Sequence, residues 1–272
     1  MAIEFISILS IPRTGTNYLC GLMGLFKEID SLFEIYHNRA VYIGKSHLAS
    51  KIIDYINCNY QLEIKNHYDT AFVNFVRQHP QEMLDIIRLQ SNKKYISFKI
   101  FPNHLSEQNL NDVIIQNKRV KKILIKRNLL NVYLSLRFAE MIKRWSDRDT
   151  SNLKLNFEIN DFVDWYARYR QYYDFIESKL KNSGGTITVL EYEQIHSYHT
   201  NRDKFTFIYN FLNSNGLQLE ENNLSISEPW LNNLRVRQDK RVNVLDKVNN
   251  PQLLVDALKE RQLEFLLNSS FR

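Results

Sequence analysis

The chain has 272 residues, of which 44% are hydrophobic, so it can bury a sizeable core and is long enough for one α/β domain. Lys and Arg outnumber Asp and Glu by 36 to 30, and the net charge of +6 suits an anionic ligand or surface without identifying it. Two cysteines, Cys20 and Cys58, are too few for a disulfide framework, and neither lies in a Cys/His metal spacing. The N-terminal apolar run is too short for a membrane span and lacks a basic leader, so we expect a cytoplasmic protein with no transmembrane segment.

Apolar runs typical of buried strands alternate with longer helical patterns along the chain. This order predicts an α/β fold with three layers, in which helices flank a central parallel sheet. We interpret the chain as a single domain, 1–272, with a helical insertion around 36–90. The strands are expected at 3–11, 95–101, 120–126 and 186–191.

The first strand ends in an unusual turn, within FISILSIPRTGTN at residues 5–17. A helix that begins near Thr16 leaves backbone N–H groups unpaired at its start, and these favour an anion. Gly15 lets a phosphate approach, and Arg13 adds a forked positive charge. A capped turn with a surface arginine explains the same residues equally well, because the full GxxxxGK[ST] phosphate-loop pattern is absent.

Two motifs resemble those of the sulfotransferase family. SIPRTGTNYL resembles the loop that binds the 5′-phosphosulfate, and KKILIKRNLLNVYLSLRF resembles the segment whose arginine and serine bind the 3′-phosphate. In the second motif Ser135 follows Arg127 by eight residues, as in the family, whereas Leu129 replaces the usual proline and Asn131 the usual aspartate. ITVLEYEQI and RVRQDKRVNVLDKVNN are similar to later family segments, so the resemblance spans most of the chain.

The resemblance implies a P-loop-like sulfotransferase architecture of the bacterial carbohydrate or lipopolysaccharide branch. Such an enzyme moves a sulfuryl group from 3′-phosphoadenosine-5′-phosphosulfate (PAPS) to a hydroxyl of a sugar or glycoconjugate, releases adenosine 3′,5′-bisphosphate and needs no metal. Members of this branch can form dimers, so a homodimer is compatible with it. The implied donor-binding residues are Arg13, Thr14, Gly15, Thr16 and Asn17 for the 5′-phosphosulfate, Arg127 and Ser135 for the 3′-phosphate, and Arg237, Gln238, Lys240 and Arg241 for a basic loop over the nucleotide.

In-line transfer needs a general base within hydrogen-bond reach of the acceptor proton. Glu34, in SLFEIYHN, resembles the base of bacterial carbohydrate sulfotransferases, and His104, in SFKIFPNHL, resembles a histidine of related members. The sequence does not decide which of the two is the base. Glu34 as an ordinary surface carboxylate and His104 as an ordinary loop histidine stay alternatives. Lys99 ranks third, as a contact to the sulfuryl oxygens, and His37 is a weaker candidate for the acceptor pocket.

Other functions are less well supported. His196 and His199 have no third ligand pattern, so we expect no metal site. The basic run at 118–126 flanks a buried strand, which argues against nucleic acid as a partner. A kinase would need a metal-binding carboxylate and a phosphate-loop lysine. The alternative of another class is a noncatalytic nucleotide- or RNA-binding protein that retains the phosphate loops.

Overall fold

The structure is a computed structural model, and it describes residues 3–44, 47–145, 148–184, 187–232, 234 and 239–268. Its centre is a five-stranded sheet with the order β2-β3-β1-β4-β5, in which all neighbouring strands run parallel. The expected central parallel sheet is therefore confirmed. The strands are β1 (Glu4–Leu9), β2 (Ile29–Ser31), β3 (Tyr95–Ile100), β4 (Val120–Lys126) and β5 (Thr188–Glu191).

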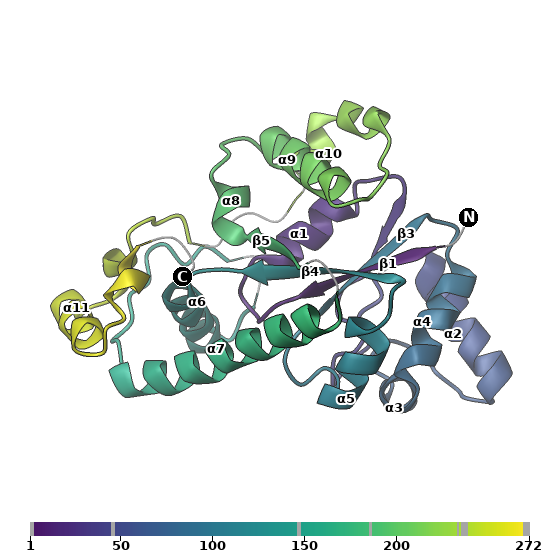
Figure 1. Ribbon diagram of the computed structural model, residues 1–272, viewed down its shortest axis with the longest axis horizontal. Helices are drawn as coiled ribbons and strands as arrows, with labels where there is room; N and C mark the ends of the chain where they lie inside the picture. The colour runs from purple at the N-terminus through teal and green to yellow at the C-terminus, as the bar shows by residue number, and fades with distance from the viewer. Residues whose placement is uncertain are drawn as a thin grey trace.

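Helices cover both faces of the sheet, which gives the three layers that the sequence predicts (Figure 1). One face carries α1 (Thr16–Met23), α8 (Tyr192–His196), α9 (Asn201–Ser214), the 3₁₀ turn η2 (Glu221–Ser225) and α10 (Glu228–Asn232). The other carries α2 (His47–Tyr60), α3 (Thr70–Gln78), α4 (Pro80–Gln90), α5 (Glu107–Asn109) with the π-helical segment η1 (Leu110–Ile115), α6 (Leu129–Ile142) and α7 (Ile159–Asn182).

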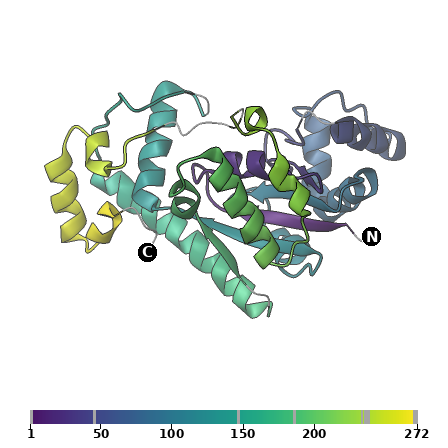
Figure 2. The same ribbon diagram turned by 90° about the horizontal axis from the view of Figure 1, so that it is seen from above.

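The C-terminal elements are the 3₁₀ turn η3 (Val244–Lys247), α11 (Pro251–Glu260) and the 3₁₀ turn η4 (Glu264–Leu267). Both ribbon views place α11 at one end of the molecule and the helices α2 to α4 at the other (Figure 2). The sheet lies between these two helical ends. Within the part of the chain that the structure describes, no helix is both long and apolar enough to cross a membrane.

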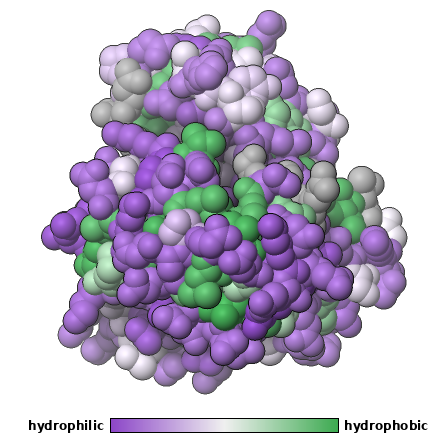
Figure 3. Space-filling view, turned by 90° about the vertical axis from the view of Figure 1, so that its left-hand side faces the viewer, coloured by the Kyte–Doolittle hydropathy of each residue, from purple (hydrophilic) through white to green (hydrophobic). Residues whose placement is uncertain are grey.

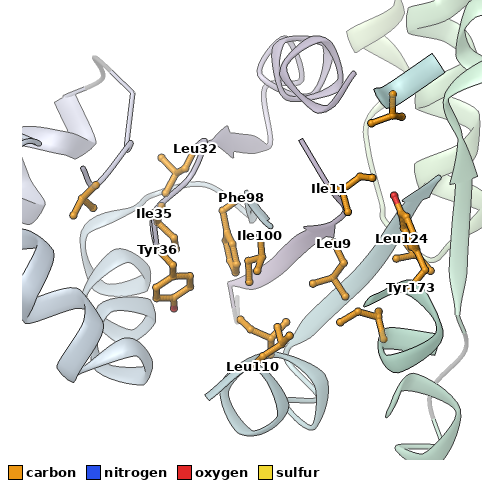
Figure 4. Packing of buried hydrophobic residues seen from close by; sticks show 14 of the residues in the cluster. Leu9, Ile11, Leu32, Ile35, Tyr36, Phe98, Ile100, Leu110, Leu124 and Tyr173 are labelled. Atoms are coloured by element: carbon orange, nitrogen blue, oxygen red, sulfur yellow. The ribbon is translucent and has the colours of Figure 1, made fainter. Parts of the chain in front are cut away.

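The first strand is buried on both faces, as its almost unbroken apolar run predicts. Phe5 and Leu9 belong to the core under α2 to α7, whereas Ile6 and Ile8 belong to the core under α1 and α9. This alternation follows from the two-residue period of a strand, and helices on both sides favour apolar residues at most positions, with the buried Ser7 as an exception. Figure 4 shows Leu9 among side chains from β3 and β4 in the first of these cores, with Phe98 nearby.

The strand predictions differ from the structure in two ways. β2 was not predicted, because its three residues, IDS, have neither the length nor the apolar content of a strand signal. β1 ends at Leu9, two residues before the predicted end, and the next residue is committed to a turn because the Ser10 hydroxyl bonds Thr14. The predicted start of the last strand at residue 186 lies outside the described residues.

The predicted insertion at 36–90 contains α2, α3 and α4. The stretch before them, 32–44, has no regular secondary structure and packs Leu32, Ile35 and Tyr36 into the core beside Phe98 (Figure 4). Ring centroids of Tyr36 and Phe98 lie 6.0 Å apart, nearly perpendicular to each other. This irregular stretch is therefore anchored to β3.

Candidate active site

The carboxyl ends of β3, β1 and β4 meet at one cavity of about 850 Å³. Arg13 follows β1, His104 follows β3 and Arg127 follows β4, and all three line this cavity. The chain leaves β1 toward β2, on the β3 side of the sheet, whereas β4 pairs with the opposite edge of β1. In open parallel sheets, ligands bind at the carboxyl ends of the strands where the strand order reverses in this way. The strands point their carboxyl ends toward the left of Figure 1, and the surface on that side is hollowed near its middle (Figure 3).

The turn after β1 has an unusual backbone. Arg13 and Gly15 both adopt left-handed conformations, with φ of 74° and 80°, and α1 begins at the next residue. Thr14 lies between them and is buried, and its hydroxyl donates to the Ile11 carbonyl at 2.8 Å. The Thr14 side chain therefore faces the protein interior, whereas Thr16 and Asn17 line the cavity at the start of α1.

Gly15 cannot carry a side chain without displacing Tyr192. An added Cβ would lie 2.4 Å from Tyr192 Cε2, and the positive φ disfavours any L-residue there. We expect Gly15→Ala to lower the free energy of unfolding by about 1–3 kcal/mol through backbone strain, with a further cost from the clash, measured by urea unfolding. Gly184→Ala is the matched control, because Gly184 also has positive φ, of 69°, and nothing lies within 4 Å of its added Cβ. Equal losses in the two variants would contradict the role of Tyr192.

Arg13, Arg127 and Ser135 form one connected group. Arg13 Nε donates to Ser135 Oγ at 3.1 Å, and Arg127 Nη1 donates to the Arg13 carbonyl at 2.7 Å. The Arg127 guanidinium also stacks 4.0 Å from the centre of the Tyr192 ring. The structure thus links residues that the sequence assigned to two separate phosphates.

This group is electrostatically suited to an anion. Burial, together with the neighbouring Arg127 charge, lowers the pKa of Arg13 to about 10. Arg127 is 9% exposed, and its buried Nε has no hydrogen-bond partner among the described residues. Since two adjacent guanidinium groups repel each other and one retains an unused donor, a phosphate oxygen would stabilise both.

Two lining residues near this group were missed by the sequence reasoning. Lys247 is 3% exposed, and its Nζ donates to Asn131 Oδ1 at 2.7 Å and lies 3.8 Å from Asp239 Oδ2. Trp145 is 56% exposed, and its carbonyl accepts a hydrogen bond from Arg13. The only sequence signal for Lys247 was its place in the basic C-terminal segment, and Trp145 gave none.

The predicted basic loop is only partly described. Arg237 and Gln238 lie outside the described residues. Arg241 pairs with Asp239 at 2.9 Å and donates to main-chain carbonyls, while Lys240 is exposed and lies 3.5 Å from Asp149. Neither Lys240 nor Arg241 is among the described residues that line the cavity, and the Arg241 side chain instead ties the C-terminal segment to the carbonyls of Thr150 and Leu153.

The three base candidates meet at one carboxylate. Lys99 Nζ lies 2.9 Å from Glu34 Oε1, and His104 Nε2 lies 3.6 Å from Glu34 Oε2. Lys99 also donates to Asn17 Oδ1, so it links the carboxylate to the start of α1. The sequence placed Lys99 third, yet it is the residue that connects the predicted base to the start of α1.

Both ring nitrogens of His104 have a defined role. The Phe101 amide donates to Nδ1 at 3.2 Å, so Nδ1 is an acceptor and the proton of the neutral ring is on Nε2, facing Glu34. Burial outweighs the attraction of Glu34 and lowers the pKa of His104 to about 4. His104 is therefore neutral at pH 7.

This depressed pKa makes the folded state sensitive to acid. The unfolded histidine has a pKa of about 6.5, so between pH 6.5 and 4 the unfolded state binds the extra proton and stability falls as pH falls. The loss from His104 reaches about 3 kcal/mol at pH 4. Urea unfolding at pH 7.5, 5.5 and 4.5 measures it. The decrease in the free energy of unfolding with falling pH should be smaller in His104→Asn, whose amide oxygen can still accept a hydrogen bond from the Phe101 amide. Part of the pH dependence that remains should come from His37, because burial also lowers its pKa. An unchanged slope in this variant would contradict the assignment.

Comparison with known proteins does not assign a family. No protein-family model matches the chain, and no curated protein matches it in sequence. Among solved structures, the chain is similar to a retinol dehydratase in complex with androsterone and the inactive cofactor PAP, with 14% identity and a TM-score of 0.40 over 98% of this chain and 82% of that one. Within the described residues, no cluster of three or more His, Cys, Asp or Glu side chains could hold a metal ion. The structural similarity is too low to support a conclusion about activity, which has to be inferred from the geometry of the cavity.

Proposed function

We propose that the chain is a PAPS-dependent sulfotransferase that transfers a sulfuryl group to a hydroxyl of a sugar or glycoconjugate. The observation that carries this proposal is that two cationic turns and a candidate base line the same cavity. The turns after β1 and β4 contribute Arg13 and Arg127, and Glu34 lies against Lys99. An enzyme for this transfer needs anion sites and a proton acceptor within one cavity.

The residues present fit a donor with anionic groups at both ends. Arg127 and Ser135 would hold the 3′-phosphate, where the unpartnered Arg127 Nε supplies a donor, and Lys247 adds a second positive charge. Arg13, the backbone at Gly15, and the first residues of α1 would hold the 5′-phosphosulfate. The bound donor would supply the sulfuryl group and leave as adenosine 3′,5′-bisphosphate.

We assign the general base to Glu34 rather than to His104. A base must have a free lone pair facing the acceptor, and the Nδ1 lone pair of His104 already accepts the Phe101 amide while Nε2 carries the proton. Glu34 is an acceptor at both oxygens, and it is held by Lys99 and faced by His104. His104 is thus a positioning residue that keeps the carboxylate in place.

Lys99 lies between the proposed base and the proposed donor site. Its ammonium contacts both Glu34 and Asn17, which belong to the acceptor and donor sides of the cavity. A fixed positive charge there stabilises negative charge that develops on the oxygens between them, at no cost of reorganisation. The side chain is fully buried, so water does not screen this charge.

Transfer from radiolabelled PAPS tests the proposal. The protein is incubated with labelled donor and a panel of oligosaccharides without added metal, and label is counted in the purified glycan. We expect transfer to at least one glycan, with an equal amount of adenosine 3′,5′-bisphosphate formed. Nucleotide binding without transfer to any hydroxyl would favour the noncatalytic alternative. RNA binding that weakens steeply with salt would favour its nucleic-acid form.

A further inference from the structure

A short loop adjoins Glu34 and lines the cavity on the acceptor side. Its two ends are joined by main-chain hydrogen bonds, since the Phe33 amide donates to the Tyr42 carbonyl and the Tyr42 amide to the Glu34 carbonyl, each at 3.2 Å. The Lys99 amide donates to the Phe33 carbonyl at 2.9 Å, which fixes the loop to β3. We call residues 33–42 the acceptor loop. Glu34 lies at its base, so whatever its tip binds is held near the proposed proton acceptor.

A row of aromatic rings leads outward from this base. The His104 and His37 ring centroids lie 5.5 Å apart, those of His37 and Tyr42 5.2 Å apart, and those of Tyr42 and Tyr68 6.2 Å apart. The three pairs meet edge to face, with interplanar angles of 79°, 63° and 89°. Tyr68 is 65% exposed, so the row reaches solvent. These rings present apolar surface with polar edges, which suits the C–H faces and hydroxyls of sugar rings.

The tip of the acceptor loop carries an arginine whose charge is not matched. Arg39 lines the cavity, is exposed, and its backbone amide donates to His37 Nδ1 at 3.1 Å. Its guanidinium has no hydrogen bond or ion pair with any residue in the described part of the chain. By contrast, Lys99 and Lys247 in the same cavity face Glu34 and Asp239. Arg39 is therefore placed to bind an anionic group of a ligand.

We propose that the acceptor is an acidic sugar, whose carboxylate pairs with Arg39 while its ring packs on Tyr42 and Tyr68. This inference rests on the proposed function, because it names the acceptor of the same site. A planar guanidinium binds a carboxylate through two parallel hydrogen bonds, so Arg39 fixes orientation as well as charge. Glu34 at the loop base then receives the proton from a hydroxyl of the bound saccharide.

Binding to matched glycan pairs tests this inference without relying on turnover. Acidic oligosaccharides that contain uronate are compared with their carboxyl-reduced counterparts on an array, and the best pair is titrated by calorimetry at low and high salt. The variants are Arg39→Ala, Arg39→Lys and the control Arg77→Ala, which changes an exposed arginine of α3 away from the cavity. Thermal unfolding verifies that each variant is folded.

We expect the acidic member to bind at least about tenfold more tightly than its reduced form, equivalent to about 1.4 kcal/mol. Arg39→Ala should abolish that difference, Arg39→Lys should keep part of it, and Arg77→Ala should keep all of it. Equal affinities within each pair, or a preference that survives Arg39→Ala, would overturn the inference.

A parallel titration with adenosine 3′,5′-bisphosphate separates the two proposals. If the nucleotide does not bind but the Arg39-dependent preference is present, the sulfotransferase proposal fails and the acidic-sugar site stands. If the nucleotide binds and no uronate glycan shows the preference, the acidic-sugar site fails and the donor site stands.

Discussion

Glu34→Gln should lower the turnover number for sulfuryl transfer by about 10²–10⁴-fold, the range that a positioned general base supplies. Glutamine keeps the size of the side chain but cannot accept a proton at pH 7. It also removes the counter-charge of Lys99, which lies 2.9 Å away, so part of the effect reflects that ion pair. Affinity for adenosine 3′,5′-bisphosphate should stay close to wild type, because the change removes a proton acceptor and not a donor contact.

Two controls make this result specific. Glu140→Gln alters an exposed glutamate of α6 that pairs with Arg137, and its turnover should match wild type. His104→Asn should lower turnover less than Glu34→Gln, because it loosens the carboxylate without removing the base. If Glu34→Gln were within threefold of wild type while His104→Asn was severely impaired, the two assignments would be reversed.

Arg127→Ala should weaken binding of adenosine 3′,5′-bisphosphate by about 10–150-fold, since a hydrogen bond to a charged group is worth about 1.5–3 kcal/mol. Binding of AMP, which lacks the 3′-phosphate, should change much less. The preference of the protein for the bisphosphate over AMP therefore falls, which is the readout that a general loss of stability would not produce. Calorimetry with both nucleotides measures it.

The side chain of Arg127 also stacks on Tyr192 and holds the Arg13 carbonyl, so Arg127→Lys is needed beside the alanine variant. Lysine keeps the charge and loses the flat, forked geometry, and it should restore part of the preference. Arg137→Ala is the control, because it removes an exposed arginine of α6, the helix that begins after Arg127. A preference ratio that is unchanged in Arg127→Ala would place the 3′-phosphate elsewhere.

The sequence predicted the strands of the sheet better than it predicted which residues line the cavity. β1, β3 and β4 are recognisable because strands covered on both faces need long apolar runs, and such runs leave a clear local signal. β2 leaves no such signal because it has three residues and a charged centre, and its pairing with β3 fixes it. The local pattern of apolar residues indicates which segments are buried. It cannot indicate β2, because this short strand forms only through its pairing with β3.

The same distinction applies to the cavity. Glu34, Lys99 and His104 were chosen from separate segments, and the structure brings them together at the end of β3. Lys247 and Trp145 could not be found from local pattern, because they reach the cavity only through the path of the chain after α6 and before α11. The side-chain direction of Thr14 was equally hidden, since a threonine in a turn can face either way.

Calorimetric titration of the purified protein with adenosine 3′,5′-bisphosphate, without added metal and with AMP and ATP as comparisons, tests the central claim most directly. We predict tight binding that depends on the 3′-phosphate and is weaker for both AMP and ATP. No binding, or a preference for ATP in the presence of magnesium, would contradict the assignment of the turns after β1 and β4 to a sulfuryl donor.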